Sequence, residues 1–143
     1  MRVLVLVKAN EDSESGRMPK TEEFAEMGKF NEQLAQAGIM LAADGLLASS
    51  KGKRVRFGGK GQGSTVIDGP FAETKELVAG FWIWQVKSLD EAAEWLRRAP
   101  FQDTEVEIRQ IAEAEDFGEE FTPELRAQEQ AIRDQLDSTS GGQ

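Results

Sequence analysis

The stretch ELVAGFWIWQVKS at residues 76–88 decides the fold. It is rich in aromatic and β-branched residues, as β-strands are. On a strand, Trp82 and Trp84 point to one face. Phe81 and Ile83 then point to the other face, so both faces are large and apolar. Helices of the same chain can cover one face, and a second copy of the protein is the simplest cover for the other, which predicts a homodimer.

The segments around this strand supply two helices and five more strands. Apolar and alternating runs predict strands at 3–7, 39–49, 54–57, 64–68 and 104–112. Helical spacing predicts a helix at 21–37, with Thr21 as its N-cap and Gly38 after its last turn. A second helix starts with the capping box Ser88–Glu91 and ends before Pro100. Its inner stripe is expected to consist of Leu89, Ala92, Ala93 and Leu96.

Three local features of these elements are also predicted. Residues 9–19 are polar and contain Gly and Pro, which indicates a loop. The strand at 39–49 is expected to be interrupted at Asp44–Gly45 by a bulge or a bend. The strands at 54–57 and 64–68 form a hairpin with a long glycine-rich loop.

The order of these elements predicts a ferredoxin-like α+β fold. Two strand–helix–strand units form one antiparallel sheet with the helices on one face. This domain is expected to span residues 1–112. Residues 113–143 are expected to form an acidic helical extension, whose helix starts at Thr122 with Pro123 in its first turn and ends in a frayed tail, DSTSGGQ.

Charge is unevenly distributed along the 143 residues. Residues 1–102 carry 14 acidic and 14 basic side chains, whereas residues 103–143 carry 12 acidic and 3 basic ones. The net charge of −9 therefore belongs to the C-terminal segment, which argues against direct binding of nucleic acid there. The longest N-terminal apolar run, MRVLVLV, is far shorter than the ~20 residues that cross a bilayer, so we expect a cytoplasmic protein with no membrane partner.

The composition limits the chemistry. The chain has no Cys, no His and no Tyr, so it lacks thiolates, the commonest general base and the commonest metal ligand. We predict no metal and no cofactor. Any catalysis must use carboxylates, Lys, Arg, hydroxyls or backbone groups.

The motif DGPF at residues 68–71 has two interpretations. As a turn, Gly69 before Pro70 adopts an extended conformation, Asp68 hydrogen-bonds a backbone N–H two residues on, and Phe71 enters the core. As a site, Asp68 is a general base or orients a ligand. The following AETKE is read as strand-like, with Glu73 and Lys75 on one face, where they form either a polar site or a surface pair.

Several of these segments resemble the YCII-related, DGPF-domain family. They are AGIMLAADGLLAS (37–49), RVRF (54–57), STVIDGPFAETKELVAGFWIWQVKSLDEAAEWLRRAP (64–100) and VEIRQI (106–111), and the match is collinear over about residues 3–112. The resemblance implies a dimeric α+β barrel in which two sheets face each other. It also implies genes beside extracytoplasmic-function sigma factors, and distant relatives that include lactone isomerases and dehydrochlorinases.

One departure from the family affects mechanism. Members similar to YciI carry a His on the first helix that works with an Asp near the second strand. Asp44 is similar in place to that Asp, but this chain has no His. The His-dependent mechanism therefore does not carry over.

Two functions remain open. The first is a small-molecule binder with a cavity in the dimer, with metal-independent acid–base catalysis, such as isomerisation or elimination, as its enzymatic form. Its predicted catalytic residues are Asp68, Glu73 and Lys75, and its ligand-binding residues are Asp44, Trp82, Trp84 and Arg109. The second is a regulatory or interaction module that works with a sigma factor, in which the acidic C-terminal helix docks on a basic partner surface.

Overall fold

The structure is a computed structural model that describes residues 1–141. It contains two compact units, Met1–Ile111 and a second unit that begins at Ala112. None of the helices in the described part of the chain has the length and apolar character needed to cross a membrane.

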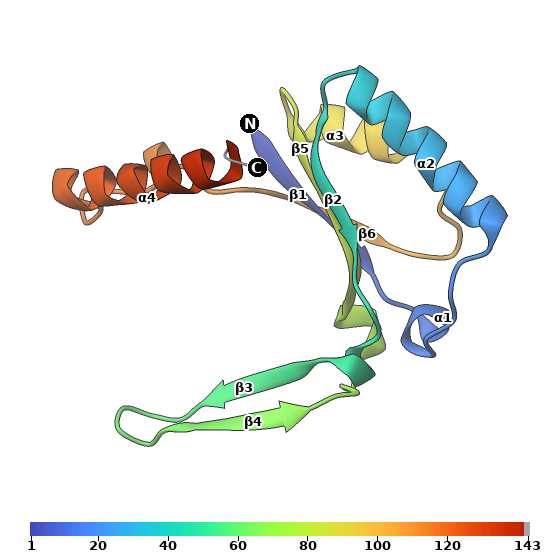
Figure 1. The fold of residues 1–143 in the computed structure, drawn as a ribbon, viewed down its shortest axis with the longest axis horizontal. Helices are drawn as coiled ribbons and strands as arrows, with labels where there is room; N and C mark the ends of the chain where they lie inside the picture. The colour runs from blue at the N-terminus through green and yellow to red at the C-terminus, as the bar shows by residue number, and fades with distance from the viewer. Residues whose placement is uncertain (142–143) are drawn as a thin grey trace. The chain divides into compact units, whose positions relative to one another are not determined.

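A four-stranded antiparallel sheet forms the centre of the first unit (Figure 1). Its strands lie in the order β2 (Met40–Gly45), β5 (Val78–Gln85), β1 (Arg2–Lys8) and β6 (Val106–Gln110). The helices α2 (Thr21–Gln36) and α3 (Leu89–Leu96) join β1 to β2 and β5 to β6, and both pack on the same face. This order is that of a ferredoxin-like sheet, so the predicted α+β fold class is confirmed.

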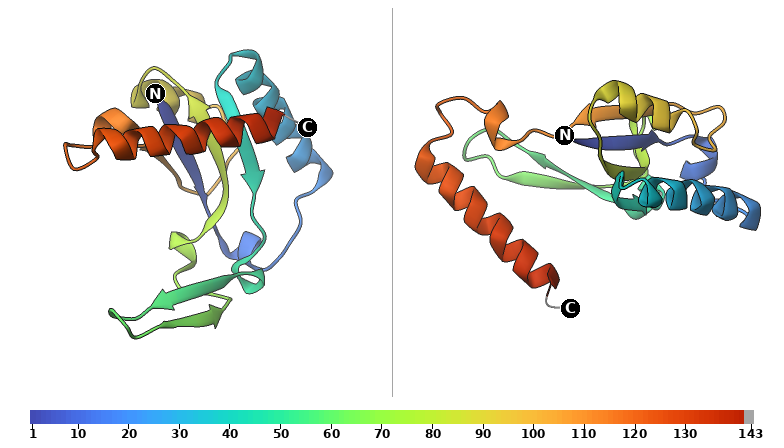
Figure 2. Two further views of the ribbon diagram at one scale, coloured as in Figure 1. Left: turned by 60° about the vertical axis from the view of Figure 1, so that its left-hand side comes forward. Right: turned by 90° about the horizontal axis from the view of Figure 1, so that it is seen from above.

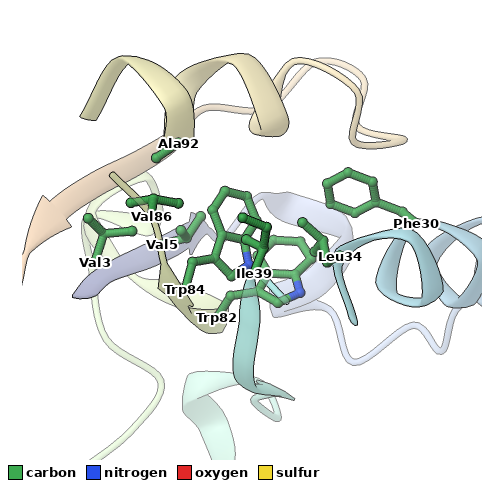
Figure 3. Packing of buried hydrophobic residues seen from close by; sticks show 9 residues of the cluster. All are labelled: Val3, Val5, Phe30, Leu34, Ile39, Trp82, Trp84, Val86 and Ala92. Carbon is green, nitrogen blue, oxygen red and sulfur yellow. The ribbon is translucent and has the colours of Figure 1, made fainter. Parts of the chain in front are cut away.

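The core lies between this sheet and the two helices. Trp84 and Leu34 are fully buried, and Trp82 is 4% exposed. Phe30 of α2 meets both indoles edge to face, at centroid distances of 5.9 and 6.4 Å. Figure 3 shows the two tryptophans between the side chains of α2 and Val5 of β1.

The opposite face of the sheet is also apolar, as the alternation predicts. Leu4 pairs with Ile83, and Leu6 pairs with Phe81, across the two central strands. All four side chains are only half-buried. We call the face that these four residues define the open face.

The helix ends agree with the sequence in most respects. Gly38 follows α2 with a φ of 73°, a conformation that favours glycine. The hydroxyl of Ser88 accepts a hydrogen bond from the N–H of Glu91 at 3.0 Å, as a capping box requires. Thr21 is not the N-cap, however. Lys20 has that position, and its side chain caps nothing.

The helix α3 turns two of the four predicted residues, Ala92 and Leu96, toward the core. Ala92 is fully buried, and Trp95 and Leu96 pack against the core. Leu89, expected on the inner stripe, is 46% exposed, and Ala93 is exposed as well. The apolar stripe of α3 that faces the core therefore consists of Ala92, Trp95 and Leu96.

The strand β2 is shorter than the predicted 39–49. It ends at Gly45, and its register against β5 shifts between Met40 and Ala42. No bulge is present at Asp44–Gly45, because both residues keep regular pairing with β5, but the strand is interrupted there, since it ends at Gly45.

The segment before α2 contains a short helix, α1 (Glu11–Glu14), which the loop prediction missed. Its first turn is stabilised by a reciprocal pair of hydrogen bonds. The N–H of Ser13 donates to Oδ1 of Asn10 at 2.8 Å, and the N–H of Asn10 donates to Oγ of Ser13 at 2.9 Å. The cap is formed by an Asn–Ser pair, which substitutes for the usual Ser–Glu pair.

The predicted hairpin is present but stands apart from the main sheet. Its strands, β3 (Lys53–Phe57) and β4 (Ser64–Asp68), form a separate two-stranded sheet between β2 and β5 in the chain. Figure 2 shows it extending away from the four-stranded sheet. Phe57 is 80% exposed on it.

The second unit consists of a short 3₁₀ turn, η3 (Ala114–Asp116), and the helix α4 (Pro123–Gly141). Its loop is held by Arg126, whose guanidinium donates to the backbone oxygens of Ala114, Phe117 and Phe121. Pro123 is the first helical residue, as predicted. The frayed tail is wrong for residues 137–141, which are helical. The last two residues lie outside the described part.

Candidate functional site

A pocket of about 690 Å³ lies within the first unit. Its walls come from α2, the neighbouring ends of β2 and β5, the segment 13–19 and the loop at Phe101. Apolar side chains make up most of the lining, and they include Met18, Phe24, Met27, Leu46, Leu47 and Phe101.

The helix α2 builds one wall because its apolar pattern is wide. Phe30 and Leu34 belong to the core. Phe24, Met27 and Asn31 follow one another at spacings of three and four residues and line the pocket. Adjacent edges of α2 therefore contribute side chains to the core and to the pocket.

The ends of β2 and β5 form a second wall, where two glycines face each other. Gly45 pairs with Gly80, and a Cβ on Gly80 would lie 3.2 Å from the carbonyl oxygen of Asp44. The N–H of Leu46 then donates to the oxygen of Ala79 at 2.8 Å. The segment that follows β2 therefore stays close to β5, and its residues Leu46 and Leu47 line the pocket.

Asn31 is a polar residue of this pocket whose side chain is held by the core. The indole Nε1–H of Trp82 donates to its Oδ1 at 2.8 Å. Both residues line the cavity. The contact holds the side-chain amide in one orientation.

Arg17 also lines the pocket, but its charge is balanced. Its Nη2 lies 3.3 Å from Oε1 of Glu23, and its Nε lies 3.6 Å from Oδ2 of Asp12. Its Nη1 donates to the oxygen of Met18 at 3.4 Å. Two carboxylates thus meet one guanidinium, which favours a neutral ligand over an anion in this pocket.

The predicted catalytic residue Asp68 lies outside this pocket. Its side chain is 75% exposed, and it forms an ion pair with Lys53 at 2.5 Å across the hairpin. The predicted bond to a backbone N–H two residues on is wrong, because that residue is Pro70, which has no N–H. Asp68 therefore links β4 to β3 at the base of the hairpin.

The rest of the DGPF motif packs against residues that are distant in the sequence. A Cβ on Gly69 would lie 1.8 Å from the carbonyl oxygen of Ser49. Oγ of Ser49 accepts from the N–H of Phe71 at 3.1 Å, while its O–H and N–H both donate to the Glu14 carboxylate. The motif is therefore a close-packed turn, and this arrangement explains its glycine.

Phe71 does not enter the core, contrary to the turn prediction. It packs under the guanidinium of Arg54, which lies 4.0 Å from the ring centroid. The hairpin base and the turn are thus held together by this stack.

Glu73 and Lys75 do not lie on a strand. Glu73 has a φ of 63° and precedes the 3₁₀ turn η2 (Thr74–Glu76), which contains Lys75. Both side chains are exposed and neither lines the pocket. The strand-like interpretation of AETKE is wrong, because one left-handed residue and one 3₁₀ turn reverse the chain before β5.

The predicted ligand-binding residues are divided between several places. Asp44 and Trp82 line the pocket. Trp84 is fully buried in the core, and its Nε1–H has no hydrogen-bond partner among the described residues. Arg109 is 73% exposed on the edge strand β6, and its Nε lies 3.8 Å from Oε2 of Glu107.

The remaining pocket residues were not identified from the sequence as functional. Asn31 is one of them. A polar residue at an apolar position of a helix was the available signal for it. Arg17 and Phe101 come from segments that carry no pattern. Across residues 1–141, no cluster of three or more acidic side chains suited to a metal ion is present.

The fold places the chain among ferredoxin-like α+β proteins. A family model described as the YCII-related domain matches residues 1–115. The chain belongs to the YCII-related family, as its resemblance implied.

Two further proteins are similar to the chain. An uncharacterized protein of Rhizobium meliloti (strain 1021) is 56% identical over 32 residues, which are 22% of this chain and only 26% of that protein. The structure of 5-chloro-2-hydroxyhydroquinone dehydrochlorinase from Burkholderia phenoliruptrix AC1100, in complex with 2,5-dihydroxybenzoquinone, is 16% identical. It aligns with a TM-score of 0.47 over 82% of this chain and 100% of that one.

Proposed function

We propose that this protein binds a small, largely apolar molecule in the pocket beside α2. The observation that carries the proposal is the cavity of about 690 Å³ with mainly apolar walls and a positioned amide. Small-molecule sites have volumes of about 300–1,000 Å³ and combine apolar walls with a few fixed polar groups. Burying about 200 Å² of apolar ligand surface contributes roughly 5 kcal/mol before the costs of association.

Residues of one chain line this pocket, and Phe81 of the open face is among them. Acid–base catalysis by Asp68, Glu73 or Lys75 has less support than binding, since none of these side chains lines the pocket. The alternative of a sigma-factor module has no support from the family match or from the structural neighbour.

The homodimer remains part of the proposal. Its support is the open face, where four apolar side chains on the two central strands are half-buried. A second copy with the same face would complete their burial. We place the dimer in the cytoplasm, the compartment that the sequence predicts.

The binding function is tested by titrating the full chain with isopropylbenzene and following backbone amide NMR signals. We expect saturable shifts in segments 13–19 and 43–48. Leu47→Asp places a charge at an exposed position of the lining and is expected to weaken binding about tenfold or more.

The matched control is Leu136→Asp. Leu136 is also an exposed leucine, on α4, and it does not line the pocket. This variant should bind as the parent does. Equal loss in both variants, or no saturable shift in the parent, would remove the proposed function.

A further inference from the structure

We propose that the pocket selects neutral ligands that carry a carbonyl group, and that the amide nitrogen of Asn31 donates the hydrogen bond that selects them. The inference rests on the proposed binding function and adds a ligand class to it. It starts from the contact between Asn31 and Trp82.

The indole fixes which end of the amide faces the pocket. The Nε1–H of tryptophan is a donor and never an acceptor. At 2.8 Å from the indole nitrogen, Asn31 must therefore present its oxygen, Oδ1, to Trp82. Its nitrogen, Nδ2, then points away from the indole with two N–H donors.

These donors have no partner in the described part of the chain. Within residues 1–141, no group accepts a hydrogen bond from Nδ2 of Asn31. Because Asn31 lines the cavity, a ligand or water there can reach them. A carbonyl oxygen is the complementary group, and a bound hydrocarbon would leave the donors unsatisfied at a cost.

Ser13 and Arg17, two other polar residues of the pocket, do not compete for this role, and the carboxylate of Asp44 is an acceptor that offers a carbonyl no donor. The hydroxyl of Ser13 is bonded to the backbone of Asn10, and Arg17 is engaged by Asp12 and Glu23. A carboxylate ligand therefore meets no free cation from these two residues. The fixed donor and the balanced charge together favour a ketone, aldehyde, ester or amide on an apolar body.

The test compares two probes of similar shape, acetophenone and isopropylbenzene, which differ chiefly in one carbonyl oxygen. Dissociation constants are measured by NMR titration of the full chain. The deciding quantity is the preference for acetophenone, the ratio of the isopropylbenzene constant to the acetophenone constant. General loosening of the pocket weakens the binding of both probes, so it largely cancels in this ratio.

Two variants isolate the donor. Asn31→Asp keeps an oxygen for the Trp82 indole and replaces Nδ2 with a second acceptor, whereas Asn31→Leu removes both polar atoms without adding charge. We expect the preference for acetophenone to fall about five- to tenfold in each variant, the size of one lost hydrogen bond. In Asn31→Asp, the indole N–H signal of Trp82 should keep the chemical shift of a hydrogen-bonded group. This would show that the pocket wall at Trp82 is intact.

The outcomes separate the two claims. If neither probe binds the parent chain, the proposed function fails. If both bind and the preference stays within about twofold in Asn31→Asp and Asn31→Leu, the carbonyl inference is overturned while the pocket stands. Loss of preference in both variants, with isopropylbenzene still bound, supports the inference.

Discussion

Gly69 shows how one residue of the DGPF motif is dictated by a distant part of the chain. Its α-carbon packs so close to the Ser49 carbonyl that a methyl group would overlap it. Its own N–H donates to the oxygen of Gly52 at 3.0 Å. The residue therefore serves close packing between the hairpin base and the turn at 49–52.

We predict that Gly69→Ala destabilises the protein by about 2–3 kcal/mol, because backbone atoms must move to admit the methyl group. Urea unfolding measures this change. The control is Gly28→Ala within α2, where nothing lies within 4 Å of a new Cβ. That change should stabilise the chain by up to about 1 kcal/mol, since Ala is the better helix former. Equal effects in the two variants would contradict this role for Gly69.

The individual elements were predicted well where the signal is local. The Ser88 cap, Gly38 after α2 and the alternation of β5 depend on residues within a few positions of each other, so the sequence contains them. The detached hairpin and the turn at 73–76 depend on which strand edges are free to pair. Only the assembled sheet decides that.

The candidate site was the least predictable part for the same reason. The pocket joins segments from residue 7 to residue 101, and no single segment has a ligand-binding pattern. Asp44 and Trp82 were chosen as ligand-binding residues and do line it. Asp68, Glu73 and Lys75 were chosen because DGPFAETKE looks polar and unusual, and the structure explains much of that stretch by its turns and its ion pair with Lys53.

The hairpin offers a prediction at the scale of an element. Phe57 is 80% exposed on β3, so Phe57→Thr should change the free energy of unfolding by less than about 0.5 kcal/mol. Thermal or urea unfolding checks this. A loss well above that size would mean that the hairpin face is covered in solution, for example by a second copy.

The whole molecule presents two features, the open face and the pocket, and Phe81 belongs to both. The chain mass is 15.8 kDa, so sedimentation should give twice that mass if the open faces pair. We predict that Ile83→Lys, which places a charge on the open face, yields the single-chain mass. Acetophenone binding should persist in that variant. A parent chain that sediments alone at micromolar concentration would contradict the dimer and leave the pocket untouched.

The central claim is that the ligand lies beside α2 and not at the DGPF turn. The most direct measurement is an NMR titration of the full chain with acetophenone, which follows the indole N–H of Trp82, the side-chain amide of Asn31 and all backbone amides. The account predicts that the largest saturable shifts fall on those two groups and on segment 13–19. Largest shifts at residues 68–76 would contradict it.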